Sequence, residues 1–113
     1  MTRTRAPLRL LFGLLLPIAG IAAVPAASAE SKEYVITMGN MSYGRVPTGI
    51  KVGDTIVWVN QDSVIHSATA RDRSFDVRAN PGQKVRMTVK KAGTIPFYCT
   101  FHSMMRGTLT VSN

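Results

Sequence analysis

The sequence has few of the side chains that form disulfides or bind metals: its 113 residues include one cysteine and two histidines. A single cysteine cannot form a disulfide within the chain, so a disulfide framework is excluded. Acidic residues are also few, six against 14 Lys and Arg, which gives a formal charge of +8. No stretch of ten or more residues combines a 3.6-residue apolar period with helix caps, so we expect little helix.

The first part of the chain differs in composition from the rest. Three arginines precede an apolar run over residues 10–24, and Ala27-Ser28-Ala29 follows it. This arrangement is typical of a secretory signal peptide, and we expect cleavage after Ala29. An uncleaved membrane anchor is the alternative, but the run is short for a span of about 20 residues and Pro17 interrupts it. We therefore predict a leader over residues 1–29 and one exported domain over residues 30–113.

The expected mature chain is basic, with 11 Lys and Arg against 6 acidic residues, a net charge of +5. Such a charge favours nucleic acid, an anionic membrane or an acidic protein as partner. Export and the lack of a recognisable binding module exclude nucleic acid, so we expect an acidic docking face on a protein partner. The alternative is that these charges are only a solvated surface. We expect a monomer with no transmembrane segment after cleavage. The side chains expected to steer the partner are Arg71, Arg73, Arg78, Lys90, Lys91 and Arg106.

Short β-rich segments separated by Gly, Pro, Asn and Asp recur along the expected domain, which predicts an all-β sandwich or barrel. In Lys84–Lys90, apolar and polar residues alternate, as in a half-buried strand. Thr55–Asn60 is nearly all apolar and β-branched, so we expect it to be more central. The predicted strands are Glu33–Met38, Gly49–Val52, Thr55–Asn60, His66–Ala70, Lys84–Lys90, Thr94–Cys99 and Thr108–Ser112.

One short segment gathers most of the side chains that can bind a soft metal. Cys99 ends one predicted strand, His102, Met104 and Met105 lie between it and the next, and His66 follows the turn after Thr55–Asn60. In a sandwich, such a turn and such a loop can meet at one end of the fold. Thiolate, imidazole and thioether suit copper and do not suit magnesium or calcium.

Each of these residues has an ordinary explanation when taken alone, since a lone cysteine or methionine is usually an apolar core residue. Together, in an exported chain where a free thiol is a liability, they favour a metal site. Zinc is the alternative metal, although thioether is a poor zinc ligand. No histidine is left for a second copper, and four protein ligands leave no open position for substrate. We therefore predict an electron-transfer centre and no enzyme activity.

The same segments resemble the cupredoxins, the family of small type I copper proteins, and within them the amicyanin branch. Lys51–Asn60 is similar to the strand before the first ligand, and Cys99-Thr100-x-His102-x-x-Met105-Arg106-Gly107 is similar to the copper loop. Phe97-Tyr98-Cys99 is closer to the plastocyanins. The resemblance implies a Greek-key β-sandwich of about eight strands, with one copper ion at one end that cycles between Cu(I) and Cu(II). The implied ligands are His66, Cys99, His102 and Met105, with Met104 as the alternative axial ligand.

The resemblance also implies roles for residues around the ligands. Asn60 would tie the two ligand-bearing segments together, the Ser67 amide would point at the sulfur, and Thr100 would lie beside them. Such outer contacts orient ligands and tune the reduction potential. Phe101 stands where amicyanins have proline, and the loss of proline should either loosen the loop or expose a backbone amide near the sulfur.

We therefore predict a periplasmic type I copper protein that carries single electrons between a redox protein donor and an acceptor. The edge of the His102 ring is the expected electron port, inside an apolar collar of Phe101, Met104 and Met41, and Tyr98 offers a second exit. Such a collar suits brief docking with small buried area. The alternative is a periplasmic copper carrier or chaperone that delivers Cu(I) in place of electrons.

Overall fold

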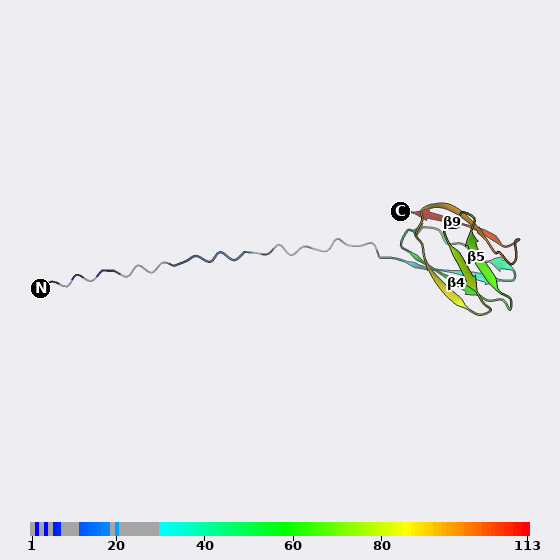
Figure 1. The fold of residues 1–113 in the computed structure, drawn as a ribbon, viewed down its shortest axis with the longest axis horizontal. Helices are drawn as coiled ribbons and strands as arrows, with labels where there is room; N and C mark the ends of the chain where they lie inside the picture. Colours follow the sequence, from blue (N-terminus) through cyan, green and yellow to red (C-terminus); the bar gives the residue numbers. More distant parts are fainter. Residues whose placement is uncertain (1, 3, 5, 8–11, 19, 21–29) are drawn as a thin grey trace.

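The computed structural model describes residues 2, 4, 6–7, 12–18, 20 and 30–113, so the predicted cleavage position lies outside the described residues. Over the described residues the chain forms nine strands in two sheets and no helix (Figure 1). The all-β sandwich that the sequence predicts is therefore confirmed. A search of these same residues finds no helix of the length and hydropathy that crossing a membrane requires.

The two sheets divide the strands between four and five. The first sheet has the order β2-β1-β4-β7, and β4 is an inner strand, as its continuous apolar sequence predicts. Its strands are β1 (Glu33–Gly39), β2 (Ser42–Tyr43), β4 (Thr55–Asn60) and β7 (Lys84–Thr88). The second sheet has the order β3-β9-β8-β5-β6. Its strands are β3 (Ile50–Lys51), β5 (His66–Ala70), β6 (Asp76–Ala79), β8 (Gly93–Tyr98) and β9 (Arg106–Ser112).

The register of the strands brings several loops to one end of the sandwich. β1 and β4 are parallel, with Met38 opposite Asn60, so the segments that follow both strands start at the same edge. The Gln61 amide donates to the Met38 carbonyl at 2.8 Å and joins these segments. β8 is antiparallel to β5 with Tyr98 opposite Thr69, which carries the segment after β8 toward the start of β5.

An aromatic cluster fills the core beneath this end. The Phe97 ring centroid lies 4.8 Å from that of Tyr43 and 5.3 Å from that of Trp58. Phe97 leaves no room for a side chain at Gly107 on the neighbouring strand, because a Cβ there would lie 2.3 Å from the ring. Offset and edge-on aromatic contacts of this kind stabilise a core beyond the area that they bury. They hold Phe97, near the end of β8 and two residues before Cys99, in place.

Two short strands, β2 and β6, are not among the predicted segments. β7 also ends at Thr88, before the predicted Lys90. Val89 is buried as the alternation predicts, but its backbone bonds to the turn at Gly53 and Asp54, with N···O distances of 2.8 Å in both directions, and leaves the ladder with β4. The Asp54 carboxylate lies in the same turn. It accepts hydrogen bonds from the backbone amides of Lys32 and Lys51, each with an N···O distance of 2.8 Å.

Candidate metal centre

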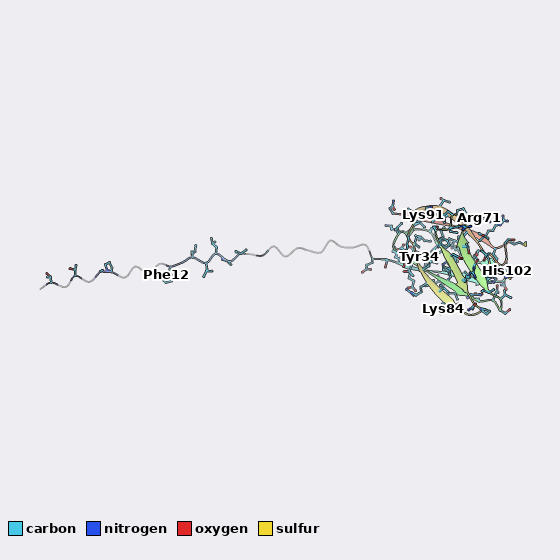
Figure 2. All side chains as sticks on the ribbon, viewed as in Figure 1. Phe12, Tyr34, Arg71, Lys84, Lys91 and His102 are labelled. Carbon is cyan, nitrogen blue, oxygen red and sulfur yellow. The ribbon has the colours of Figure 1, made fainter. Side chains whose placement is uncertain are left out.

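Three of the four predicted ligand residues are buried together where β8 ends and β5 begins. Cys99, His66 and Met105 are almost fully excluded from solvent, and the Cys99 Sγ lies 3.9 Å from the His66 Nδ1. The half-buried His102 ring lies 5.1 Å from the His66 ring, centroid to centroid, and Figure 2 shows it at one end of the domain. Met104 does not share this burial, because it is 93% exposed.

The segment from Cys99 to Met105 is a closed loop. The Cys99 amide donates to the Met105 carbonyl at 3.1 Å, and the Met105 amide donates to the His102 carbonyl at 2.9 Å. These two bonds turn the chain so that a cysteine and a methionine six residues apart both enter the interior. The short spacing in the sequence therefore produces a compact set of sulfur and nitrogen donors.

Backbone amides surround the Cys99 sulfur. Burial raises the pKa of the Cys99 thiol, but the Ser67 amide, which donates to Sγ at 3.3 Å, and the His66 ring lower it. The amides of Phe101 and His102 act in the same direction, and the pKa falls below its usual value. A thiolate is the form of cysteine that binds metals. Phe101 supplies a donor that a proline would lack.

The two ring nitrogens of His66 face different groups. Nε2 lies 2.7 Å from the Asp62 carboxylate, which leaves Nδ1 on the side of the Cys99 sulfur. Asp62 also accepts the amides of Asn40 at 2.8 Å and Met41 at 3.0 Å. The Met41 amide and the His66 ring hold the pKa of this carboxyl below its usual value. A carboxylate on the outer nitrogen fixes the tautomer and the orientation of a histidine ligand.

Ser67 and Thr100 link the two segments that carry the predicted ligands. The Thr100 amide donates to the Ser67 Oγ at 2.8 Å, and the two hydroxyls lie 3.1 Å apart. The resemblance implies this linking role for Asn60, and that role stays a prediction. The Asn60 Nδ2 donates to the carbonyls of Val64 at 2.8 Å and Ala79 at 2.9 Å. Asn60 thus holds the loop before His66 against β6, because it ends a strand of the opposite sheet.

Sequence reasoning missed two residues of the surroundings, Asp62 and Tyr43. The Tyr43 hydroxyl donates to the Ser67 carbonyl, in the residue whose amide faces the sulfur. Burial raises the pKa of the Tyr43 hydroxyl, and the nearby Cys99 thiolate raises it further. Asp62 had a usable signal, a carboxylate four residues before a candidate histidine ligand. Tyr43 had none, since its contact depends on how the two sheets pack.

The His102 ring offers a test of whether a metal fits. Its Nε2 is buried without a hydrogen-bond partner among the described residues. Buried polar atoms nearly always have a partner, and a metal ion would be one. Within the part of the chain that the structure describes, His, Cys, Asp and Glu side chains alone form no group of three or more that could hold a metal. The donor types fit copper, and the exact ligand set stays a prediction.

Comparison with known proteins decides the family. A family model described as a cupredoxin-like domain matches residues 11–111.

The chain belongs to the cupredoxin family.

Among the curated relatives, amicyanin from Paracoccus denitrificans is 30% identical over 95 residues, which cover 77% of this chain and 72% of that protein. Amicyanin from Paracoccus versutus is 29% identical over 94 residues, which cover 78% and 71%.

Solved structures agree with this assignment. A reduced amicyanin variant with phenylalanine in place of a proline superposes with a TM-score of 0.60 at 29% identity, covering 70% of this chain and 81% of that one. A purple cupredoxin from Nitrosopumilus maritimus has a TM-score of 0.60 at 26% identity, covering 74% and 100%. Cupredoxins carry electrons through bound copper, so copper is the cofactor of this chain.

Proposed function

We propose that this cupredoxin is an exported electron carrier that holds one copper ion through His66, Cys99, His102 and Met105. The observation that carries the proposal is the buried Cys99 sulfur, with an amide hydrogen bond from Ser67 on one side and the His66 Nδ1 on another. Bound there, copper would supply one-electron chemistry between Cu(I) and Cu(II). Met105 is the axial candidate because it is 2% exposed, against 93% for Met104.

The surrounding residues would keep the ligands still while the charge changes. Asp62 fixes the His66 ring, and the Ser67 and Thr100 contacts join the two ligand-bearing segments. Hydrogen bonds to the sulfur withdraw negative charge from it, so the amides of Ser67 and Phe101 would tune the reduction potential. These roles are binding and orientation, and the chain is similar to the amicyanins, so we infer an electron carrier and no enzyme.

The His102 ring would be the electron port. It is half-buried, and Phe101 and Met104 beside it are 42% and 93% exposed. A small apolar surface of this kind suits brief contact and fast release. Tyr98, whose ring lies 4.5 Å from the Arg71 guanidinium, is the second exit that we propose.

The docking partners we propose are a redox protein donor and acceptor with acidic faces. All six basic side chains that the sequence singles out are exposed: Arg71, Arg73, Arg78, Lys90, Lys91 and Arg106. Arg71 and Lys91 lie on one edge of the domain in Figure 2, and Lys91 pairs with Asp72 at 2.7 Å. Arg71 and Arg73 line one hollow with Tyr98 and Asp76, so two of the basic side chains lie beside the proposed second exit. Complementary charge would speed association.

We also propose that residues 1–29 are removed on export and that the mature monomer works in the periplasm. Three apolar side chains of the leader, Phe12, Leu15 and Ile18, are 89%, 95% and 95% exposed. Burial in the domain therefore does not account for their apolar character, whereas recognition as a signal peptide does. Determination of the N-terminal residue of the exported protein tests this, and we expect Glu30.

The second candidate function is a copper carrier that delivers Cu(I), which the exposed thioethers of Met41 and Met104 favour. Voltammetry of the copper-loaded protein separates the two functions. An electron carrier gives a reversible one-electron couple and retains its copper in the presence of a Cu(I) chelator. Rapid loss of copper to the chelator, without a reversible couple, would support the carrier instead.

A further inference from the structure

A solvent-facing hollow of about 490 Å³ borders two of the proposed copper ligands, His102 and Met105. It is lined by Met41, Phe101, His102, Ser103, Met104 and Met105. Half of these side chains carry thioether sulfur, which is a soft donor that selects Cu(I). Thioether sulfur therefore lines the hollow both at the surface, on Met41 and Met104, and at the buried axial candidate Met105.

Core packing does not explain the two outer methionines. Met41 is 47% exposed and Met104 is 93% exposed, although methionine is among the residues most often buried. An apolar docking collar would need only apolar area, which leucine or valine supplies equally well. The feature that distinguishes methionine from those residues is its sulfur.

The backbone at Met41 strengthens this point. Asn40 and Met41 both have positive φ, 52° and 59°, in the two-residue turn that joins β1 to β2. A turn of this type favours Asn-Gly, and a long side chain at its second position is unfavourable. The Asp62 carboxylate holds the turn by accepting both amides. Residues kept in sparsely populated backbone regions cluster at functional positions.

We propose that Met41 and Met104 form an entry site that captures Cu(I) and passes it to the buried ligands, with His102 between the two sites. The inference rests on the proposed function, because it needs the ligand set below. No electron moves in this step, since Cu(I) stays Cu(I) and exchanges one set of ligands for another. His102, whose buried Nε2 lacks a partner among the described residues, is one of the residues that line the hollow.

The test is the rate at which the metal-free protein takes Cu(I) from its coloured bicinchoninate complex, followed by loss of that colour. The double variant Met41→Leu and Met104→Leu keeps the apolar area and removes both sulfurs. We expect its loading to slow several-fold while the final copper content and the oxidised spectrum stay unchanged. Met87→Leu, on β7 and outside the hollow, is the matched control and should load at the wild-type rate.

A second measurement detects metal binding at Met41 and Met104 when the buried site lacks its cysteine. In the Cys99→Ala variant, titration with Ag(I), an ion that mimics Cu(I) without changing oxidation state, should shift the methyl NMR signals of Met41 and Met104 and leave that of Met87 in place. Equal loading rates for the double variant and the wild type, with normal blue copper in both, would overturn the entry site alone. Failure of the wild type to form blue copper would instead overturn the proposed function and the entry site with it.

Discussion

At the scale of single residues, the two nitrogens of His66 show how the surroundings select the chemistry of a side chain. Asp62 lies on Nε2, so only Nδ1 is available on the side of the sulfur. The same carboxylate accepts hydrogen bonds from two amides of the turn after β1. It therefore connects the loop before His66 to that turn. A ligand held in this way binds its metal with little reorganisation.

Replacement of Asp62 by alanine should therefore weaken copper binding by about 10–100-fold, the usual effect of removing an outer-shell partner. A competition titration with a chelator of known affinity measures this. Asp72→Ala is the matched control, because Asp72 accepts hydrogen bonds from Lys91 and Ser74, neither of which is a proposed ligand. An Asp62 variant with wild-type affinity and spectrum would show that the carboxylate does not position the ligand.

Substitution of single methionines tests whether Met105 or Met104 is the axial ligand. Met105→Gln should lower the reduction potential, because an amide oxygen is a harder donor than a thioether and favours Cu(II) over Cu(I). Met104→Gln, one residue away and fully outside the interior, should leave the potential unchanged. Voltammetry of both variants decides the matter. A shift in the Met104 variant alone would reverse the assignment.

At the scale of strands, the sequence predicts the long elements and the two-residue β3, and it misses the short strands β2 and β6. β4 and β5 have the predicted bounds, because a strong β-branched run marks one and clear turn residues bound the other. β2 has two residues and depends on the Asn40-Met41 turn, where the usual Asn-Gly signal is absent. β6 alternates exposed and buried residues, but four residues that include Asp and Arg give a weak signal.

The residues of the candidate site also divide into those with a local sequence signal and those without one. Its sulfur and imidazole side chains were predictable from residue type and spacing. The contacts of Asp62, Tyr43 and Asn60 depend on which strand ends meet, and parallel pairing of β1 with β4 is a long-range feature that no local pattern contains.

The pairing of β8 with β9 yields a stability prediction. Gly107→Ala should destabilise the metal-free protein by about 1–3 kcal/mol, since its Cβ would lie 2.3 Å from the Phe97 ring and force overpacking. Denaturant unfolding measures the change. Gly39→Ala in β1 is the control, because its Cβ would approach only the flexible Gln61 side chain, at 3.3 Å. Equal losses in the two variants would show that the Phe97 contact does not govern stability here.

At the scale of the whole molecule, the excess of positive charge acts on encounter rates more than on the fold. Electron exchange with an acidic redox protein should slow as salt rises, because the Debye length falls to about 10 Å at 0.1 M. Exchange with a neutral small oxidant should change little over the same range.

The position of the charge matters as well as its sum. Arg71→Glu with Arg73→Glu should slow exchange with the acidic partner more than a double reversal at Lys84 and Arg86, which lie on the first sheet. Figure 2 shows Lys84 on the edge of the domain away from Arg71. Stopped-flow rates extrapolated to zero ionic strength make the comparison. Equal slowing by the two pairs would mean that net charge alone, without a docking face, sets the rate.

The most direct test of a copper centre built on Cys99 is the absorption and EPR spectrum of the oxidised, copper-loaded protein beside its Cys99→Ala variant. We expect an intense visible band from the thiolate–copper bond, the narrow copper hyperfine splitting of a type I centre, and loss of both features in the variant. A colourless wild type, or a variant with an unchanged spectrum, would contradict the assignment of Cys99 and with it the proposed function.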